Sequence, residues 1–120
     1  MTDQAHAPDC LFCRIIRREI PASIVYEDDR LLAFNDISPQ APVHVLVVPK
    51  RHVASLNDLT AGDEGLVGEL VRRAAAIAAD RGVAAGGYRT VFNCNRDAGQ
   101  TVFHVHLHLL GGRPMTWPPG

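Results

Sequence analysis

Three histidines, His104, His106 and His108, occupy alternate positions within residues 100–110 and are separated by aliphatic residues. Successive side chains of a β-strand point to opposite faces, so this spacing predicts a strand that presents all three imidazoles on one face. Imidazole transfers protons, attacks electrophiles and binds metals near neutral pH. A polar strand face that is rich in histidine by chance is the alternative, and three histidines in register favour a functional site over it.

The spacing also bears on the kind of chemistry. On a regular strand, side chains at positions i and i+4 lie about 13 Å apart at their bases, whereas a Zn–N bond is about 2.1 Å long, so the three histidines cannot share one ion. His106 has an imidazole on each side, which favours nucleophilic or acid–base work. The loop before the strand adds polar groups from Gly99, Gln100 and Thr101, and Asn93 adds a carboxamide. Donor-rich turns of this kind hold anionic oxygens, phosphate above all.

The elements that must position these residues follow from periodicity and turn signals. Strands are expected over residues 23–27, 31–36, 43–48, 88–93 and 100–110. A capping box at Thr60 and Asp63 predicts a long helix that ends near Arg81, and a short helix is expected from a cap at Asp9 to Arg18. Strands joined by short links, with one covering helix, predict an α+β fold with an antiparallel sheet.

The whole chain sets the class of protein. It has 120 residues, 47% of them hydrophobic, and a net charge of −1, which predicts one globular domain without affinity for nucleic acid or membranes. Residues 1–8 are expected to be a disordered tail, and residues 9–120 a single domain. No signal peptide or transmembrane segment is apparent, so the expected location is the cytoplasm. Three cysteines, an odd number, do not suggest a disulfide framework.

The segment from His104 to Leu110 resembles the histidine triad signature of the HIT superfamily, in which three histidines alternate with apolar residues. The resemblance to the Hint branch of that superfamily runs from Cys10 to Gly120, through residues 20–21, 33–42, 48–50, 98–100, 111–115 and 117–120. It implies a five-stranded antiparallel sheet with one long and one short helix. It also implies a two-fold dimer that joins two sheets through edge strands, with Trp117 packed near the partner's active site.

The resemblance implies hydrolysis of purine nucleoside 5′-phosphoramidates, such as AMP-amide or AMP-lysine, through a nucleotidyl-histidine. The catalytic residues that it implies are the nucleophile His106, the flanking His108 and His104, a fourth histidine His44, and Thr101. The nucleotide contacts that it implies are Asp36 to ribose, Ile37 to the base, and Asn93, Gly99, Gln100, Thr101, His106 and His108 to phosphate.

Two other functions stay open. One is a nucleotide-binding interaction module with incidental activity, and the other is a dinucleoside polyphosphate hydrolase of the Fhit branch, whose members lack the tail of residues 111–120. The uridylyltransferase branch has glutamine at the third triad position, so the intact His108 favours hydrolysis. Thr101 stands where Hint proteins usually have serine, and Asn35 and Thr116 stand where they often have histidine. The leaving group, the base preference and the physiological substrate therefore remain undetermined.

Cys10 and Cys13 form a C-x-x-C pair that is compatible with two buried residues, a redox pair or half of a zinc site. The resemblance implies that His52 and His104 complete a tetrahedral structural Zn²⁺ site with these thiols. No cofactor is expected for the chemistry itself. If zinc binds, His104 is structural rather than catalytic.

Overall fold

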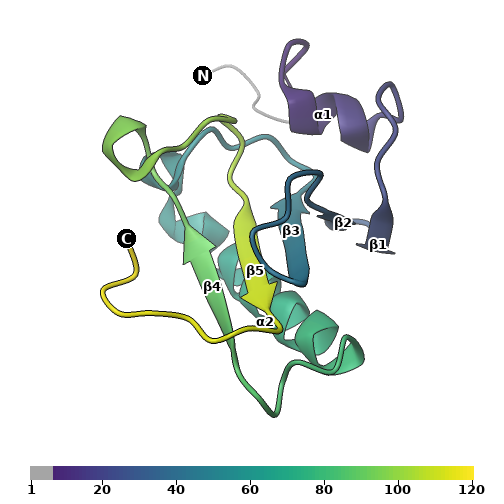
Figure 1. The fold of residues 1–120 in the computed structure, drawn as a ribbon. Coiled ribbons are helices and arrows are strands. Elements are labelled where there is room, and N and C mark those ends of the chain that lie inside the picture. Colours follow the sequence, from purple (N-terminus) through teal and green to yellow (C-terminus); the bar gives the residue numbers. More distant parts are fainter. Residues whose placement is uncertain (1–6) are drawn as a thin grey trace.

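The computed structural model describes residues 7–120, which form an α+β fold around one antiparallel sheet (Figure 1). The strands are β1 Ile24–Glu27, β2 Leu31–Asn35, β3 Val43–Pro49, β4 Tyr88–Phe92 and β5 Leu107–Gly111. The helices are α1 Leu11–Ile16 and α2 Glu64–Asp80, with 3₁₀ turns η1 Leu56–Asp58, η2 Ala61–Asp63 and η3 Arg96–Ala98. The strand order β1-β2-β3-β5-β4 confirms the predicted five-stranded antiparallel sheet.

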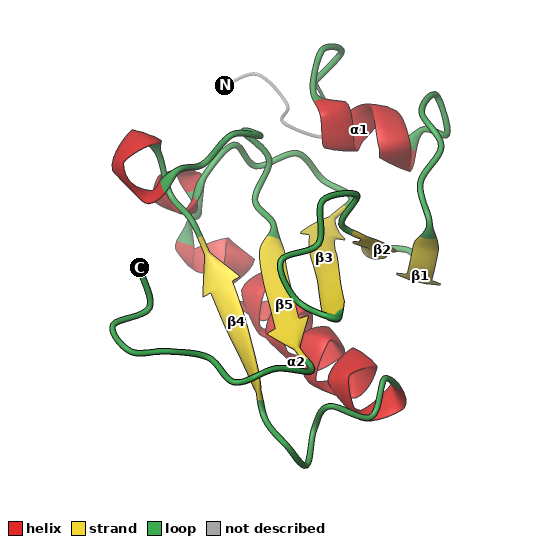
Figure 2. Cartoon of the chain, in the orientation of Figure 1, coloured by secondary structure: helices red, strands yellow, loops and turns green. Residues whose placement is uncertain are grey.

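Helix α2 covers one face of the sheet, as Figure 2 shows, and packs its apolar side on β3 and β5. The buried residues of this layer include Leu66, Leu70 and Ile77 from α2, whereas Val71 of the same helix is 45% exposed. The capping box at Thr60 and Asp63 is confirmed, and the chain enters α2 through the 3₁₀ turn η2. Within residues 7–120, no helix is long and apolar enough to cross a membrane.

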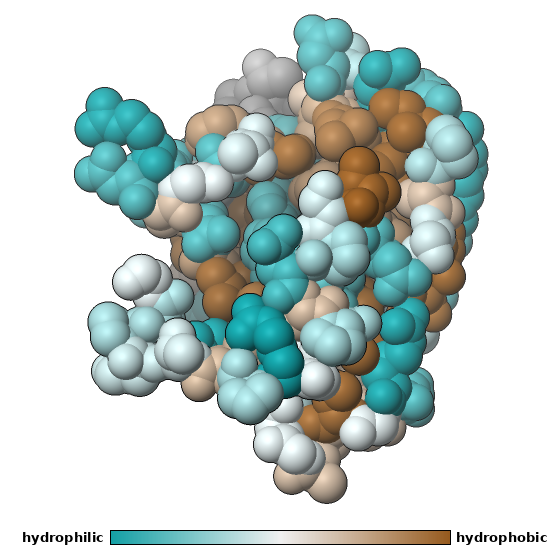
Figure 3. Space-filling view, in the orientation of Figure 1, coloured by the Kyte–Doolittle hydropathy of each residue, from teal (hydrophilic) through white to brown (hydrophobic). Residues whose placement is uncertain are grey.

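The short helix α1 packs over the opposite face, where Phe12 and Ile15 join Leu32, Phe34 and other buried residues of β2 and β3. The predicted cap at Asp9 is wrong: Cys10 is the N-cap residue, and its Sγ accepts a hydrogen bond from the Cys13 N–H at 3.4 Å. In the space-filling view, apolar surface is concentrated on the α1 side, whereas the surface over β4 and the C-terminal tail is mostly polar (Figure 3).

The histidine segment departs from the expected strand over residues 100–110. Strand β5 begins only at Leu107, which pairs with β3 on one side and β4 on the other. Residues 101–106 leave the sheet and bond to a loop instead, with Val105 N–H donating to Val53 O at 2.7 Å. The apolar residues of the alternation, Val105, Leu107 and Leu109, are all buried. Side chains on both sides of the segment are buried, since His104 and His106 are 0% and 7% exposed. The alternation could not show where the neighbouring strands end.

Candidate active site

A cavity of about 310 Å³ lies between α1, the ends of β2 and β3, and the histidine segment. The polar residues of its lining include Asp36, Thr101, His106 and His108, and Ile37 stands at the same cavity with 97% of its surface exposed. Most of the remaining lining is apolar, including Leu11, Phe12 and Ile15 from α1. Five residues that were predicted from sequence to hold a nucleotide therefore converge on one cavity. A larger hollow of about 460 Å³ near Arg30 and Arg72 contains no histidine.

The ring of His106 is held in one tautomer. Its Nδ1 lies 2.7 Å from the backbone carbonyl oxygen of His104, and a carbonyl can only accept, so Nδ1 carries the proton. Phe12 packs edge-on against the ring with a centroid distance of 5.0 Å. Burial lowers the pKa of His106 and keeps the ring neutral at pH 7. The lone pair on Nε2 is consequently available for attack on an electrophile.

His108 is oriented by a chain of hydrogen bonds that starts at a backbone amide. The Gln40 N–H donates to His44 Nδ1 at 3.0 Å, so the proton of His44 is on Nε2. His44 Nε2 then donates to His108 Nδ1 at 2.9 Å, which leaves the proton of His108 on Nε2. Burial lowers the pKa of His44, and burial together with the nearby His106 and His44 lowers that of His108 to about 4. Both rings are therefore neutral at pH 7, and His108 offers an N–H donor.

Asp36 lies beside these histidines. Its Oδ1 accepts the Ser38 N–H at 2.8 Å, and its Oδ2 is 3.4 Å from His44 Nε2. The donor atoms of Asp36, His44 and His108 lie within 4.8 Å of one another, which is close enough for a shared cation. The tautomers do not fit one, because His44 Nδ1 accepts the Gln40 N–H and a metal on Nε2 would require an imidazolate. One carboxylate oxygen thus remains for a hydroxyl of a ligand.

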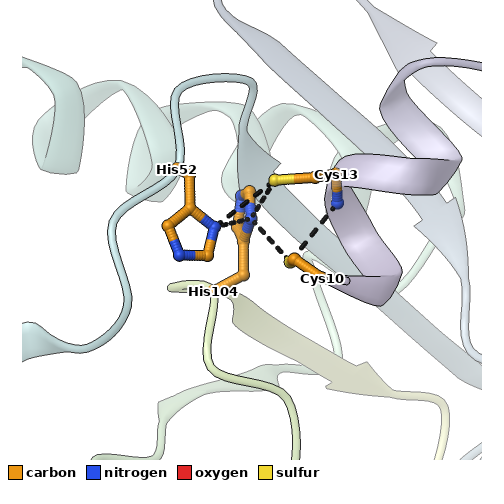
Figure 4. Close-up of side chains that lie close together, drawn as sticks. All are labelled: Cys10, Cys13, His52 and His104. Carbon is orange, nitrogen blue, oxygen red and sulfur yellow. Dashed lines mark hydrogen bonds between the residues drawn. The ribbon is translucent and has the colours of Figure 1, made fainter. Parts of the chain in front are cut away.

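A second group of donors lies behind His106, where Cys10, Cys13, His52 and His104 point toward a common centre (Figure 4). We call this group the Cys₂His₂ cluster. The distances between its sulfur and Nδ1 atoms are 3.3 Å for Cys13 to His52, 3.5 Å for Cys13 to His104 and 3.4 Å for Cys10 to His104. The two Nδ1 atoms are 3.2 Å apart. A tetrahedral Zn²⁺ with ordinary bond lengths would place such donors about 3.4 to 3.6 Å apart, so the four side chains fit the ion.

The tautomer of His104 fits the same ion. His104 Nε2 donates to Pro49 O at 2.7 Å, so the Nδ1 lone pair faces the sulfurs, and a carbonyl partner of this kind is typical of metal-bound histidine. Burial lowers the pKa of His104 to about 4, whereas burial raises the pKa of the Cys13 thiol to about 11. The side chain of His104 is completely buried and does not line the cavity. Its backbone carbonyl orients the ring of His106.

The loop before the histidine segment is only partly as expected. Thr101 is exposed and lines the cavity, whereas Asn93 and Gly99 do not line it. Gln100, a predicted nucleotide contact, does not line the cavity, and both N–H groups of its carboxamide donate to backbone carbonyls of the protein. Trp117 is 83% exposed in this chain, and the tail beside it is attached to β4 by a 2.9 Å hydrogen bond from Arg89 to Thr116 O.

Three groups that shape the site were not identified from the sequence. Two are backbone groups, the Gln40 N–H and the Pro49 carbonyl, and no residue type identifies a backbone partner in advance. The third is Phe12, which contacts the rings of both His104 and His106. Its i, i+3 spacing from Ile15 was the available signal, since it places both residues on the same helix face.

Comparison with known proteins decides the family. The model of the HIT domain matches residues 17–115. The chain belongs to the HIT family. The matched region of this HIT domain contains His44, His52 and the three histidines of the triad. The two cysteines of the Cys₂His₂ cluster and Phe12 precede it.

Similar proteins cover nearly the whole of this HIT protein. A purine nucleoside phosphoramidase of Escherichia coli is 50% identical over 109 residues, which are 91% of this chain and 92% of the relative. An uncharacterized HIT-like protein of Synechococcus elongatus is 57% identical over 93% of this chain and 97% of its own length. The crystal structure of a HIT family hydrolase from Legionella pneumophila has a TM-score of 0.92 and 54% identity, and covers 93% of this chain and 100% of that one.

Proposed function

We propose that this HIT protein hydrolyses purine nucleoside 5′-phosphoramidates, of the AMP-amide or AMP-lysine type, through a nucleotidyl intermediate on His106. The observation that carries the proposal is the fixed tautomer of His106. Its Nδ1–H is bound to the His104 carbonyl, so its Nε2 lone pair is the available nucleophile in a cavity that also contains Asp36 and Thr101. The 50% identity to a purine nucleoside phosphoramidase supports the choice of substrate class.

The chemistry takes place in two steps. His106 Nε2 forms a bond to the α-phosphorus while the bond from phosphorus to the leaving nitrogen breaks, and the amine leaves with a proton taken up from water. Water then attacks the phosphorus, which breaks the bond to His106, releases the nucleoside monophosphate and returns the proton. His108 Nε2–H donates a hydrogen bond to the reacting phosphate, and the Thr101 hydroxyl gives a second donor. Phosphoryl transfer depends mainly on such positioned donors.

The rest of the cavity matches a nucleoside. Leu11, Phe12 and Ile15 form an apolar wall for the base, and Ile37 covers it from the solvent side. The oxygen of Asp36 that is not bound to Ser38 can accept from a ribose hydroxyl, as carboxylates do in other nucleotide sites.

Detection of the covalent intermediate tests this function. We expect intact-protein mass spectrometry during turnover of AMP-amide to show an adenylyl adduct, with peptide mapping to His106. In His106→Asn the adduct and the hydrolysis disappear while AMP still binds, because the substitution leaves the rest of the cavity in place. The exposed substitution Asp97→Asn is the control and keeps wild-type turnover. Full turnover by His106→Asn would overturn the mechanism. Faster hydrolysis of diadenosine triphosphate than of AMP-amide would show that the protein is a dinucleoside polyphosphate hydrolase instead.

We propose in addition that the Cys₂His₂ cluster holds a structural Zn²⁺ through Cys10, Cys13, His52 and His104. The ion would supply no chemistry to the reaction, because these donors face away from the cavity and their four positions complete its tetrahedral coordination. Elemental analysis of freshly purified protein should find about one zinc per chain, and Cys10→Ser with Cys13→Ser should remove it. Freshly purified wild-type protein that contains no zinc and takes up none when zinc is added would refute this assignment.

We further propose a two-fold dimer formed through β4. This strand is at an edge of the sheet, and exposed edges are usually covered. The exposed Trp117 on the neighbouring tail would pack against the second chain. Sedimentation equilibrium should give twice the mass of one chain, and a monomer at micromolar concentration would exclude the dimer. The cytoplasm is the compartment that we propose, since the free thiols of the cluster need a reducing environment.

A further inference from the structure

The side chain of Gln100 connects three separate backbone segments. It is only 7% exposed, and its Oε1 accepts the Asn95 N–H at 2.8 Å. Its Nε2 donates to Ala54 O at 2.9 Å and to Val102 O at 3.0 Å. The orientation of the carboxamide is determined by these partners, because the opposite orientation would place its N–H groups against a donor and its oxygen against two acceptors.

The loop that Gln100 closes has an unfavourable backbone conformation. Asn95 has a φ of 66° and Gly99 a φ of 80°, and L side chains such as that of asparagine rarely adopt this region. The backbone adds only the bonds from Gly99 N–H to Arg96 O and from Gln100 N–H to Asn95 O. The Gln100 carboxamide therefore supplies the bond that holds the Asn95 amide in place.

The same side chain ties this loop to the segment that carries the nucleophile. Ala54 follows Val53, whose carbonyl accepts the Val105 N–H at 2.7 Å. Val102, the other acceptor of Nε2, lines the cavity together with Thr101. Thr101 thus lies between Gln100 and Val102, which are joined by this hydrogen bond, although its own side chain is exposed.

We propose that Gln100 is a positioning residue for the phosphate of the substrate: its buried carboxamide sets the place of Thr101 and the neighbouring backbone relative to His106. This inference rests on the proposed function. Gln100 does not touch the substrate, because its N–H groups and its backbone amide are already bound within the protein. Its removal weakens the contacts with the phosphate and leaves the binding of the nucleoside unchanged, since the apolar wall comes from α1.

Binding of two matched ligands tests the proposal. Titration calorimetry with AMP and with adenosine, which lacks the phosphate, is carried out on wild type, Gln100→Met and Gln100→Glu. Methionine keeps the volume and loses all three hydrogen bonds, whereas glutamate keeps the acceptor for Asn95 and loses the two donors. Asp97→Asn is the control: it replaces an acid by an amide, the reverse of Gln100→Glu, on an exposed side chain of the same loop.

We expect the Kd for AMP to rise at least about tenfold in Gln100→Met while the Kd for adenosine changes less than about twofold. Gln100→Glu should show the same selective loss, and it replaces Gln100→Met if that variant does not fold. In both variants kcat for AMP-amide should fall as well, whereas Asp97→Asn retains wild-type values. An equal loss of affinity for AMP and for adenosine, or no loss of affinity for either, would overturn the role of Gln100. Wild type that fails to bind AMP would instead overturn the proposed function itself.

Discussion

Removal of metal from the Cys₂His₂ cluster should release α1 from the sheet. The helix has only six residues, and helices of this length are not stable in isolation. Its main packing comes from Phe12 and Ile15, which together contribute about 3 to 6 kcal/mol if each is fully buried. Fixing six backbone residues costs about 6 to 12 kcal/mol, which packing of these two side chains does not exceed, so the proposed zinc would supply the difference.

The expected consequence concerns both stability and binding. Protein stripped with a chelator should unfold about 10 °C lower than protein saturated with zinc at 100 times its Kd, which corresponds to about 2.7 kcal/mol. Amide hydrogen exchange in residues 11–17 should become at least about 100-fold faster, while α2 remains protected. Affinity for AMP should fall, because Leu11, Phe12 and Ile15 form one wall of the cavity.

The control for this experiment is the variant Cys10→Ser with Cys13→Ser. It cannot form the site, so neither zinc nor chelator should change its melting temperature, its exchange in α1 or its affinity for AMP. Metal-free wild type with unchanged exchange in residues 11–17 and unchanged AMP affinity would refute the reasoning, because α1 would then be held by packing alone.

Other predictions concern the histidines and one close contact in the fold. Burial lowers the pKa of His108 in the folded protein to about 4 from 6.5. Its contribution to the free energy of unfolding is therefore present above pH 6.5 and declines by about 1.4 kcal/mol per pH unit as the pH falls toward 4. The free energy of unfolding of His108→Gln, measured in urea, should depend less steeply on pH. His44→Phe removes the bonds to Gln40 and His108 and should cost about 2 kcal/mol, with a coupling of about 1 kcal/mol to His108→Phe in a double-mutant cycle. Gly111→Ala would place Cβ 2.9 Å from Val83 Cγ2 and should destabilise by about 1 to 3 kcal/mol, which Val83→Ala partly restores. Additive effects of these last two substitutions would contradict the contact.

Much of the fold was predictable because its elements have strong periodic signals. The apolar face of α2, the β-branched run of β3 and the capping box at Thr60 each determined an element to within a few residues. The convergence of Asp36 and His106 on one cavity was predictable only through the family resemblance, since the two residues are 70 positions apart.

The remaining features depend on information that a single sequence does not contain. A period of two continues from residue 104 to 109, but β3 and β4 pair with β5 only from Leu107 onward, and the length of a partner strand cannot be read from the strand itself. Cysteine is not among the preferred N-cap residues, so Asp9 was predicted as the cap, whereas the structure has Cys10 there. The tautomers of His104 and His106 depend on backbone carbonyls, which every residue has.

The late start of β5 has a consequence for engineering this fold. An automated redesign for stability would favour extending β5 back through residues 101–106, because added ladder hydrogen bonds and regular strand geometry are standard ways to improve a sheet. In such a strand, the carbonyl of His104 would be turned toward a neighbouring strand and could no longer accept the Nδ1–H of His106. The ring would then be free to rotate, and the more stable protein would be a poorer catalyst. The irregular residues 101–106 should therefore be kept fixed in any optimisation of this chain.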